Sequence, residues 1–437
     1  MTEVDHSSPR VLILGAYGLI GSEIVAACLA CGWQVSGLGR DPTQMLAPIR
    51  WITADLGTLT RRDDWAPLLA DVDVVINAAG ALQDGPSGRV SMVHDQAIAA
   101  LALAARPAGV RRIVQISAVG ALPGASTEFL STKAAGDAAI RAAQVEHVIL
   151  RPGLVLGRSV YGGSALLRML AAVPWVQPVA FGDARIQVIG MDALTRAVLQ
   201  ASDGTLPPGT ECDLVADTPV TLEDLLNATR AWLGFASARA ILRLPSGLAR
   251  LAGRLADGLA WLGWRSPLRT TALVALAEGV TGDPAPWRKL TGQGVPGLDA
   301  ILAAQPATLQ DRWHARMSLL LPVILVTLSM FWLASGLVGL ARQDMAAAVL
   351  DGTALSPFWA KSAVLGGAAA DISLGLLVLY RPWAGHACLG MILVSLLYLV
   401  GGTILVPQLW LDPLGPLVKV FPSLVLALAL IPLLRSR

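Results

Sequence analysis

The sequence predicts an α/β protein in which a doubly wound parallel sheet comes first and an all-α domain of four transmembrane helices follows. Three observations support this fold class. Short apolar runs alternate with helical segments up to residue 160, a glycine-rich turn follows the first run, and the residues after Arg316 carry very few charges. Strands that alternate with helices are typical of a parallel sheet covered by helices on both faces.

Five short apolar runs are the predicted buried strands of this sheet. Each is flanked by glycine or a charged residue and is followed by a helical pattern. The runs are residues 11–14, 34–38, 73–80, 112–117 and 147–153. We therefore place the first domain at residues 1–160.

Residues 161–310 are expected to complete the same fold and to end in an amphipathic helical linker region. The segment 221–235 is a well-marked helix, since Thr221 is a typical N-cap with an acid, Asp224, three residues later. The segment 248–269 is amphipathic, with tryptophans beside arginines. It either lies on a membrane surface or packs against the first domain, and packing is the preferred interpretation.

The third predicted domain, residues 311–437, has the composition of a membrane protein. Of the whole chain, 54% of the residues are hydrophobic and 15% are charged, whereas a soluble protein has about a quarter of charged residues. About 20 apolar residues cross a bilayer. The predicted spans are residues 317–341, 361–380, 387–407 and 414–434.

The charged residues that flank these spans predict the orientation. Positive residues gather on the side that holds both ends of the membrane domain, which favours a cytoplasmic location for both termini. They are Arg312, Arg316, Arg381, Arg435 and Arg437, against Arg342, Lys361 and Lys419 on the other side. The polar start of the chain lacks the pattern of a secretory signal peptide. We expect a multi-pass protein of the inner (cytoplasmic) membrane with its nucleotide-binding domain in the cytoplasm.

Composition also argues against several partners. A formal net charge of +2 gives no reason to expect nucleic-acid binding. The four cysteines are too scattered for a disulfide framework, and Cys28 and Cys31 form a C-x-x-C on a helix that should pack against the sheet. We interpret this pair as buried apolar residues. The five histidines have no metal-ligand spacing, so no metal is expected.

The segment "VLILGAYGLIG" predicts a dinucleotide site in a Rossmann-type fold. Gly15 permits the tight turn after the strand, Gly18 lets the backbone approach a pyrophosphate, and Gly21 lets the following helix pack closely. The helix N-terminus faces the anion. Tyr17, Leu19 and Ile20 lie in the same turn and are included in the predicted cofactor site.

The second strand ends at Arg40, followed by Asp41. An arginine at this place receives the additional phosphate of NADP, whereas an acid binds the ribose of NAD. NADP(H) is therefore the preferred cofactor, and NAD(H) stays open because Asp41 could turn towards a ribose.

These motifs resemble an atypical or extended short-chain dehydrogenase/reductase, of the branch that includes NmrA-like proteins and the 39-kDa-type subunit of respiratory complex I. The matching pieces occur in the family's order over about 150 residues. They are "GAYGLIG", "GRDP", "ADL", "NAAG", "ISAVG", "FLSTKAAGD" and "LRPGLVLG". The C-terminal spans resemble a DoxX-like domain, mainly by their number.

The resemblance implies further cofactor contacts. Asp55 and Leu56 would border the adenine, and Ala78, Ala79 and Gly80 would line the cofactor after the next strand. Lys133 would bind the nicotinamide ribose. Pro152 and Gly153 would flank the nicotinamide end. These positions are expectations carried over from the family.

The catalytic residues depart from the family pattern at one place. A tyrosine normally lies four residues before the lysine and protonates the substrate oxygen, and here that position is Phe129. Ser117 would hold the carbonyl and Lys133 would orient the cofactor, so these two are the predicted catalytic residues. Phe129 itself could simply pack in the core. Ser131, Thr132 and Tyr161 are nearby hydroxyls, and Tyr161 could reach the nicotinamide pocket.

Two functions follow from these residues. The first is a membrane-anchored NADP(H)-binding oxidoreductase acting on a lipophilic carbonyl or a quinone-like substrate. The second is a non-catalytic NAD(P)H-binding protein that is structural, senses redox state or serves a membrane partner complex. Asp371 is the only charged residue between Lys361 and Arg381, and it is either functional or a buried acid that is neutralised or paired between helices.

Overall fold

The computed structural model describes residues 8–41, 47–80, 90–264, 266 and 268–435. The chain divides into two compact units. Unit 1 comprises Met1–Asp257 and Ser266–Arg312, and unit 2 comprises Gly258–Arg265 and Trp313–Arg437. Each unit is described by itself below.

Unit 1 contains a sheet that, within the described residues, has seven strands. All of its neighbouring strands pair in parallel. Their order is β11-β6-β5-β4-β1-β2-β3, which is doubly wound about β1, and the predicted fold class is confirmed. The strands are β1 (Arg10–Leu14), β2 (Gln34–Gly39), β3 (Arg50–Thr53), β4 (Val74–Asn77), β5 (Arg112–Ile116), β6 (Glu146–Pro152) and β11 (Thr210–Leu214).

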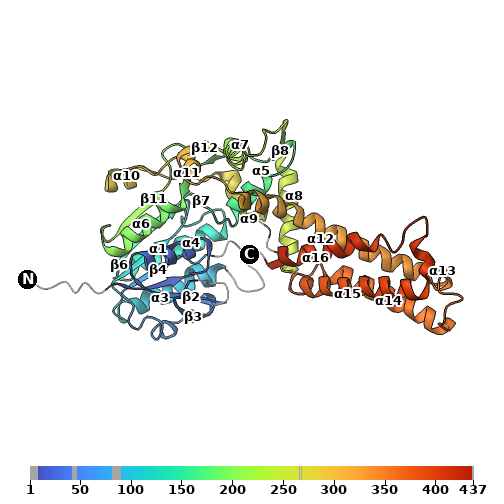
Figure 1. Cartoon of the computed structure of the whole chain (residues 1–437). Helices are drawn as coiled ribbons and strands as arrows, with labels where there is room; N and C mark the ends of the chain where they lie inside the picture. Colours follow the sequence, from blue (N-terminus) through green and yellow to red (C-terminus); the bar gives the residue numbers. More distant parts are fainter. Residues whose placement is uncertain (1–7, 42–46, 81–89, 265, 267, 436–437) are drawn as a thin grey trace, which may run out of the picture. The chain divides into compact units, whose positions relative to one another are not determined.

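Helices cover both faces of this sheet (Figure 1). On one face, α1 (Leu19–Ala30) and α6 (Met191–Asp203) form a core with the strands. On the other face lie α2 (Arg62–Trp65), α3 (Ala97–Ala105) and α4 (Glu128–Ala142). The prediction for the C-x-x-C pair is half right, because Cys28 is buried in the first core while Cys31 is exposed. Cys31 is one turn later, at the C-cap of α1.

The remainder of unit 1 forms a smaller core beyond the carboxyl ends of the strands. It contains α5 (Gly163–Ala171), α7 (Leu222–Trp232) and α11 (Leu298–Ala304), with three short two-stranded sheets. The predicted cap of α7 is present, since the Thr221 side chain accepts a hydrogen bond from the backbone N–H of Asp224. The strands of the short sheets are β7 (Leu154–Leu156), β8 (Val176–Val179), β9 (Arg185–Ile186), β10 (Val188–Gly190), β12 (Val220–Thr221) and β13 (Ala240–Arg243).

Three further helices lie between α7 and α11 in the chain. They are α8 (Ser246–Trp261), α9 (Thr270–Glu278) and α10 (Ala285–Thr291). Gly253 of α8 faces α9 closely enough that an added Cβ would lie 2.9 Å from the Leu273 side chain. Asp257 accepts a hydrogen bond from the backbone N–H of Thr270 at 3.4 Å. One face of the predicted amphipathic segment therefore packs on α9.

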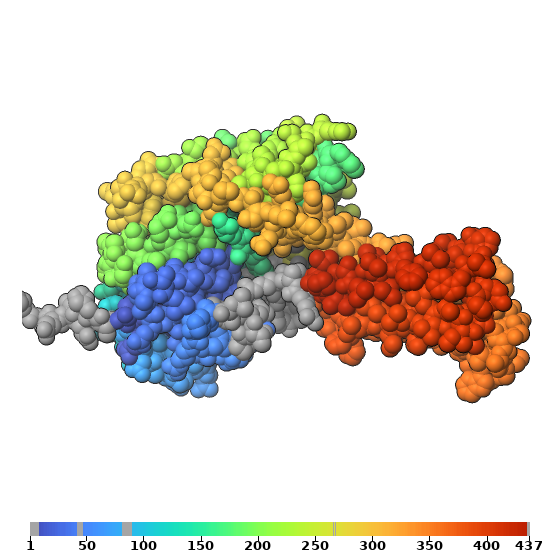
Figure 2. Space-filling model, in the orientation of Figure 1, coloured from blue at the N-terminus to red at the C-terminus, as the bar shows by residue number. Residues whose placement is uncertain are grey.

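Unit 2 is helical, and three helices among the described residues are long and apolar enough to cross a membrane. They are α12 (Leu309–Ala341), α14 (Pro357–Leu377) and α15 (Arg381–Leu405). The fourth predicted span, residues 414–434, corresponds to α16 (Val420–Arg435), a shorter apolar helix of 16 residues. The short helices α13 (Gln343–Ala348) and η4 (Pro407–Trp410) lie between these elements. The red C-terminal segment includes α16, which packs on α15 (Figure 2).

Asp371 lies buried where three of these helices meet. Its carboxylate accepts hydrogen bonds from the Ser335 hydroxyl of α12 at 2.7 Å and from the Tyr398 hydroxyl of α15 at 2.9 Å. Small residues allow this approach, since a Cβ on Gly367 would lie 2.8 Å from the Tyr398 hydroxyl. Of the two interpretations of Asp371, the structure therefore shows pairing between helices.

Candidate functional site

The glycine-rich turn between β1 and α1 is built for close approach of a ligand. Gly15 has a φ of +71°, and a Cβ there would lie 2.8 Å from the Ala79 backbone. A Cβ on Gly21 would collide with the Gly15 carbonyl oxygen. The α1 N-terminus has no acid in its first turn and no side-chain hydrogen bond from its N-cap, Gly18. The backbone N–H groups in the first turn of α1 therefore fit an anion such as a pyrophosphate.

Arg40 lies directly after β2, beside this turn. A hydrogen bond with Tyr17 raises the pKa of the Arg40 guanidinium, and the nearby Asp55 and Tyr161 act in the same direction. The Tyr17 ring packs on Trp51 of β3 with 6.0 Å between ring centroids. The predicted residues Tyr17, Arg40 and Asp55 thus surround one place at the end of β2, although β3 itself was not predicted.

Asp55 and Leu56 form the start of a short turn of helix, η2 (Leu56–Thr58). The Asp55 carboxylate accepts a hydrogen bond from the Gly57 N–H at 3.0 Å. Leu56 is buried in the core below. Asp55 is therefore fixed by its own turn.

Lys133 projects from α4 between β4 and β5. It is 4% exposed, and its ammonium donates hydrogen bonds to the carbonyls of Ile116 at 2.9 Å and Ala79 at 3.1 Å. Burial lowers the pKa of Lys133 to about 8, while Asp137 acts in the opposite direction. The structure thus brings Lys133 next to Ala79 and Gly80, two of the residues predicted to line the cofactor.

Ser117 lies in a buried polar network rather than in an open site. Its hydroxyl donates to Asp137 at 2.6 Å. The same carboxylate accepts from Gln115, which in turn accepts from Asn77. Burial raises the pKa of Asp137, and its bond to Ser117 opposes that change. The Ser117 hydroxyl already donates its hydrogen bond to Asp137. The predicted contact of this serine with a substrate carbonyl would therefore require that hydrogen bond to break.

Pro152 and Gly153 lie at the carboxyl end of β6, as predicted. The Pro152 carbonyl accepts a hydrogen bond from the Val119 N–H at 3.3 Å, and the Gly153 N–H donates to Leu214 at 3.1 Å. A Cβ on Gly153 would lie 2.5 Å from the Gln187 carbonyl oxygen. Tyr161 is half-exposed, and its influence on Arg40 places it near the end of β2.

His94 is a site residue that the sequence analysis missed. It is buried on a π-helical turn, η3 (Met92–Gln96), and its ring meets Phe129 edge-on with 5.5 Å between centroids. Its Nε2 and the Lys133 Nζ would lie 3.8 Å and 3.9 Å from a Cβ on Gly80. A π-helical turn is a frequent mark of a functional site, but a single histidine without metal spacing gave no signal in the sequence.

The Thr132 hydroxyl determines the tautomer of His94. Thr132 Oγ1 donates to the Glu128 carbonyl at 2.7 Å and lies 3.2 Å from His94 Nδ1. Since its proton is already used, Thr132 accepts from Nδ1–H, and Nε2 of the neutral ring is the acceptor. Burial and the Lys133 charge lower the pKa of His94 well below its usual value.

Comparison with known proteins now identifies both parts of the chain. Residues 15–162 match an NAD(P)H-binding family, and residues 329–428 match the DoxX-like family. The chain therefore joins an NAD(P)-binding domain to a DoxX-like domain, and this fusion is the arrangement that the sequence predicted. The DoxX-like domain and the three long apolar helices mark this fusion as a membrane protein.

Relatives of this fusion include a ceramide reductase from Caulobacter vibrioides, 27% identical over 65% of this chain and 89% of the relative. A second relative is subunit 9 of the mitochondrial NADH dehydrogenase (ubiquinone) 1 alpha subcomplex of Mus musculus. It is 28% identical over 33% of this chain and 40% of its own length. In structure, the fusion resembles an NAD-bound short-chain dehydrogenase/reductase superfamily protein from Agrobacterium tumefaciens. That likeness has a TM-score of 0.51, 16% identity and coverage of 71% of this chain and 98% of the other, and it shows the fold.

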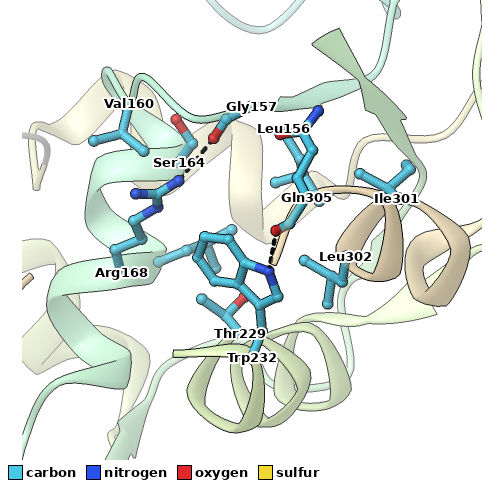
Figure 3. A pocket seen from close by; sticks show the side chains of 11 residues that line it. Leu156, Gly157, Val160, Ser164, Arg168, Thr229, Trp232, Ile301, Leu302 and Gln305 are labelled. Atoms are coloured by element: carbon cyan, nitrogen blue, oxygen red, sulfur yellow. Dashed lines mark hydrogen bonds between the residues drawn. The ribbon is translucent and has the colours of Figure 1, made fainter. Parts of the chain in front are cut away.

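A separate cavity of about 30 Å³ lies in the smaller core of the fusion, around Arg168 of α5 (Figure 3). Arg168 donates to the Gly157 carbonyl at 2.7 Å and pairs with Asp311 at 2.6 Å. Trp232 donates to the Gln305 carbonyl at 2.6 Å. This volume is enough for about one or two waters, and the predicted cofactor residues do not line it. Among the described residues, no group of histidine, cysteine and acid side chains could hold a metal ion.

Proposed function

We propose that this protein is a membrane-anchored, NADP(H)-dependent oxidoreductase that acts on a lipophilic carbonyl or quinone-like substrate. The observation that carries the proposal is the position of Lys133, whose ammonium lies beside Ala79, the residue that approaches the Gly15 turn. A nicotinamide nucleotide on the glycine turn would reach this lysine at the carboxyl edge of the sheet. The bound nucleotide would supply hydride.

The preference for NADP(H) rests on Arg40. Its guanidinium bonds to Tyr17 beside the glycine turn, where the ribose phosphate of NADP would lie. Asp55, an acid whose charge acts on Arg40, is engaged with the Gly57 N–H. Arg40 and the tyrosine hydroxyls of Tyr17 and Tyr161 therefore supply donors for a phosphate.

Lys133 is the proposed source of the proton that Phe129 cannot give, and His94 is the proposed positioning residue. A lysine with a pKa of about 8 is charged at pH 7 and releases its proton more readily than an ordinary lysine. In reduction of a ketone, hydride would reach the carbonyl carbon and the Lys133 ammonium would protonate the oxygen, which yields the alcohol. The Nε2 atom of His94 is an acceptor close to the ammonium, and through it His94 would position Lys133.

The membrane domain and one relative suggest the substrate class. A ceramide reductase matches 65% of this chain, and a long-chain lipid would partition into the bilayer that holds the DoxX-like domain. We therefore propose a lipid ketone, with a keto-ceramide as the first compound to test. Location in the inner membrane, four spans and a cytoplasmic nucleotide-binding domain are parts of the same proposal.

The second candidate function is a non-catalytic NAD(P)H-binding membrane protein. Phe129 favours it, because the usual acid is absent. Ser117 favours it as well, because its hydroxyl is held by Asp137.

The deciding experiment measures binding and turnover on the full chain purified in mild detergent. Nucleotide titration should show NADPH binding, and NADPH oxidation should occur with a keto-ceramide or a quinone. Lys133→Met should abolish turnover, whereas Phe129→Tyr should increase ketone reduction. His94→Gln should lower kcat and move its pH profile with little change in NADPH affinity, and His147→Gln on β6 is the matched control. Binding without turnover towards any acceptor would leave the non-catalytic function.

A further inference from the structure

Helix α8 has one face that packs on its own unit and another that does not. The packed face consists of small residues, Ala249, Gly253 and Ala256, which are buried. The large apolar residues are on a different face. Leu248, Leu251 and Leu255 are 54%, 53% and 63% exposed.

These leucines form a continuous row along the helix. Their spacing of three and four residues brings successive side chains onto one face. Gly253 of the small-residue face packs closely on α9, whereas the leucine row is uncovered.

The charges next to the row are positive. Arg250 and Arg254 are exposed and, one helical turn apart, lie along one side of the leucines. Asp257 is the only acid in residues 246–262, and it is turned to Arg269 and Thr270. An apolar row with an arginine flank is the pattern of a helix that lies in the headgroup region of a bilayer.

We propose that the leucine row of α8, residues Leu248, Leu251 and Leu255, is a membrane-contact surface that inserts into the headgroup region of a lipid bilayer containing anionic lipid. A bilayer is the occupant that the chain itself supplies, since α8 leads into unit 2 and α12 is the first of three apolar helices long enough to span. The arginines would bind lipid phosphates while their stems lie along the leucines. This surface would bring the nucleotide-binding unit to the lipid interface, and it does not depend on turnover.

The test uses the full chain in lipid nanodiscs of phosphatidylcholine and phosphatidylglycerol. In a Cys31→Ser background, a fluorophore is attached at Leu251→Cys or Leu255→Cys. The matched control is Leu103→Cys on α3, because Leu103 is 67% exposed and is not on α8. We expect a nitroxide on the lipid headgroup to quench the α8 labels much more strongly than the label at position 103.

A second variant separates lipid contact from other causes. With the label at Leu248→Cys, the double change Leu251→Glu and Leu255→Glu should remove the quenching. Because both side chains are exposed, thermal stability should stay unchanged. Quenching at α8 no stronger than at position 103 would overturn the proposal. Shielding of α8 from aqueous iodide without quenching by the lipid nitroxide would overturn it too, since a protein surface would then cover the row.

Discussion

Lys133 makes the stability of unit 1 depend on pH in a direction that can be measured. Burial lowers its pKa from 10.5 to about 8, which corresponds to about 3 kcal/mol in favour of the uncharged amine. The folded state binds this proton less readily than the unfolded state. Burying the charged ammonium therefore lowers the free energy of unfolding. This loss is absent above pH 10.5, grows as the pH falls, and is complete below pH 8.

Lys133→Met removes the titrating group and isolates this effect. The variant also loses the bonds to Ile116 and Ala79, so its stability at any one pH has two causes. The change in this stability between pH 7 and pH 10 comes mainly from the titration of the Lys133 amine. Between pH 7 and pH 10 the wild-type protein should gain about 2–3 kcal/mol relative to the variant, a rise of about 5 °C or more in the difference between their Tm values.

The assay follows unfolding by the reaction of buried thiols with a fluorogenic maleimide in a Cys31→Ser background. Cys28 and Cys212 report on unit 1, because both are buried there. Lys289→Met on α10 is the control, since that lysine is exposed and its removal should give no pH-dependent difference. A difference between wild type and Lys133→Met that stays constant from pH 7 to pH 10 would refute the account of Lys133.

Three further predictions concern the cofactor and the membrane helices. Gly21→Ala should abolish NADPH binding, because its Cβ would collide with the Gly15 carbonyl, whereas Gly247→Ala has open space and should bind normally in the same titration. Arg40→Ala should reduce NADPH affinity by about tenfold or more and leave NADH affinity nearly unchanged, as expected for loss of a charge-assisted phosphate contact; equal losses would show that Arg40 does not read the phosphate. Tyr398→Phe should destabilise unit 2 by about 1 kcal/mol through loss of its bond to Asp371, measured as a thermal shift in detergent, and an unchanged Tm would contradict this role.

The sequence predicted the sheet core well because its strands are apolar on both faces. Runs such as residues 11–14 and 112–117 are short, rich in β-branched residues and bounded by charges or glycine, which is typical of buried parallel strands. The glycine turn then fixes the first crossover. Strand β3, Arg50–Thr53, was missed because an edge strand carries a weaker apolar pattern. Strand β11 was missed because Glu211 and Asp213 interrupt it.

The candidate site was predictable where one local motif defines it and not where distant segments meet. Gly15, Gly21 and Lys133 belong to such motifs. His94 meets Phe129 and Thr132 across 35 residues or more of sequence, so only the packing of η3 on α4 reveals it. The bond from Ser117 to Asp137 likewise depends on how β5 packs on α4.

The ion pair between Arg168 and Asp311 has a practical consequence for separating the two halves of the fusion. A chain cut after residue 310, at the boundary that composition suggests, would leave the buried Arg168 guanidinium without its carboxylate. Removing one partner of a buried pair costs about 3–5 kcal/mol. A soluble version of the nucleotide-binding unit should therefore retain the first turn of α12 through Arg312. The same holds for any exchange of the membrane anchor, which should be joined after that turn.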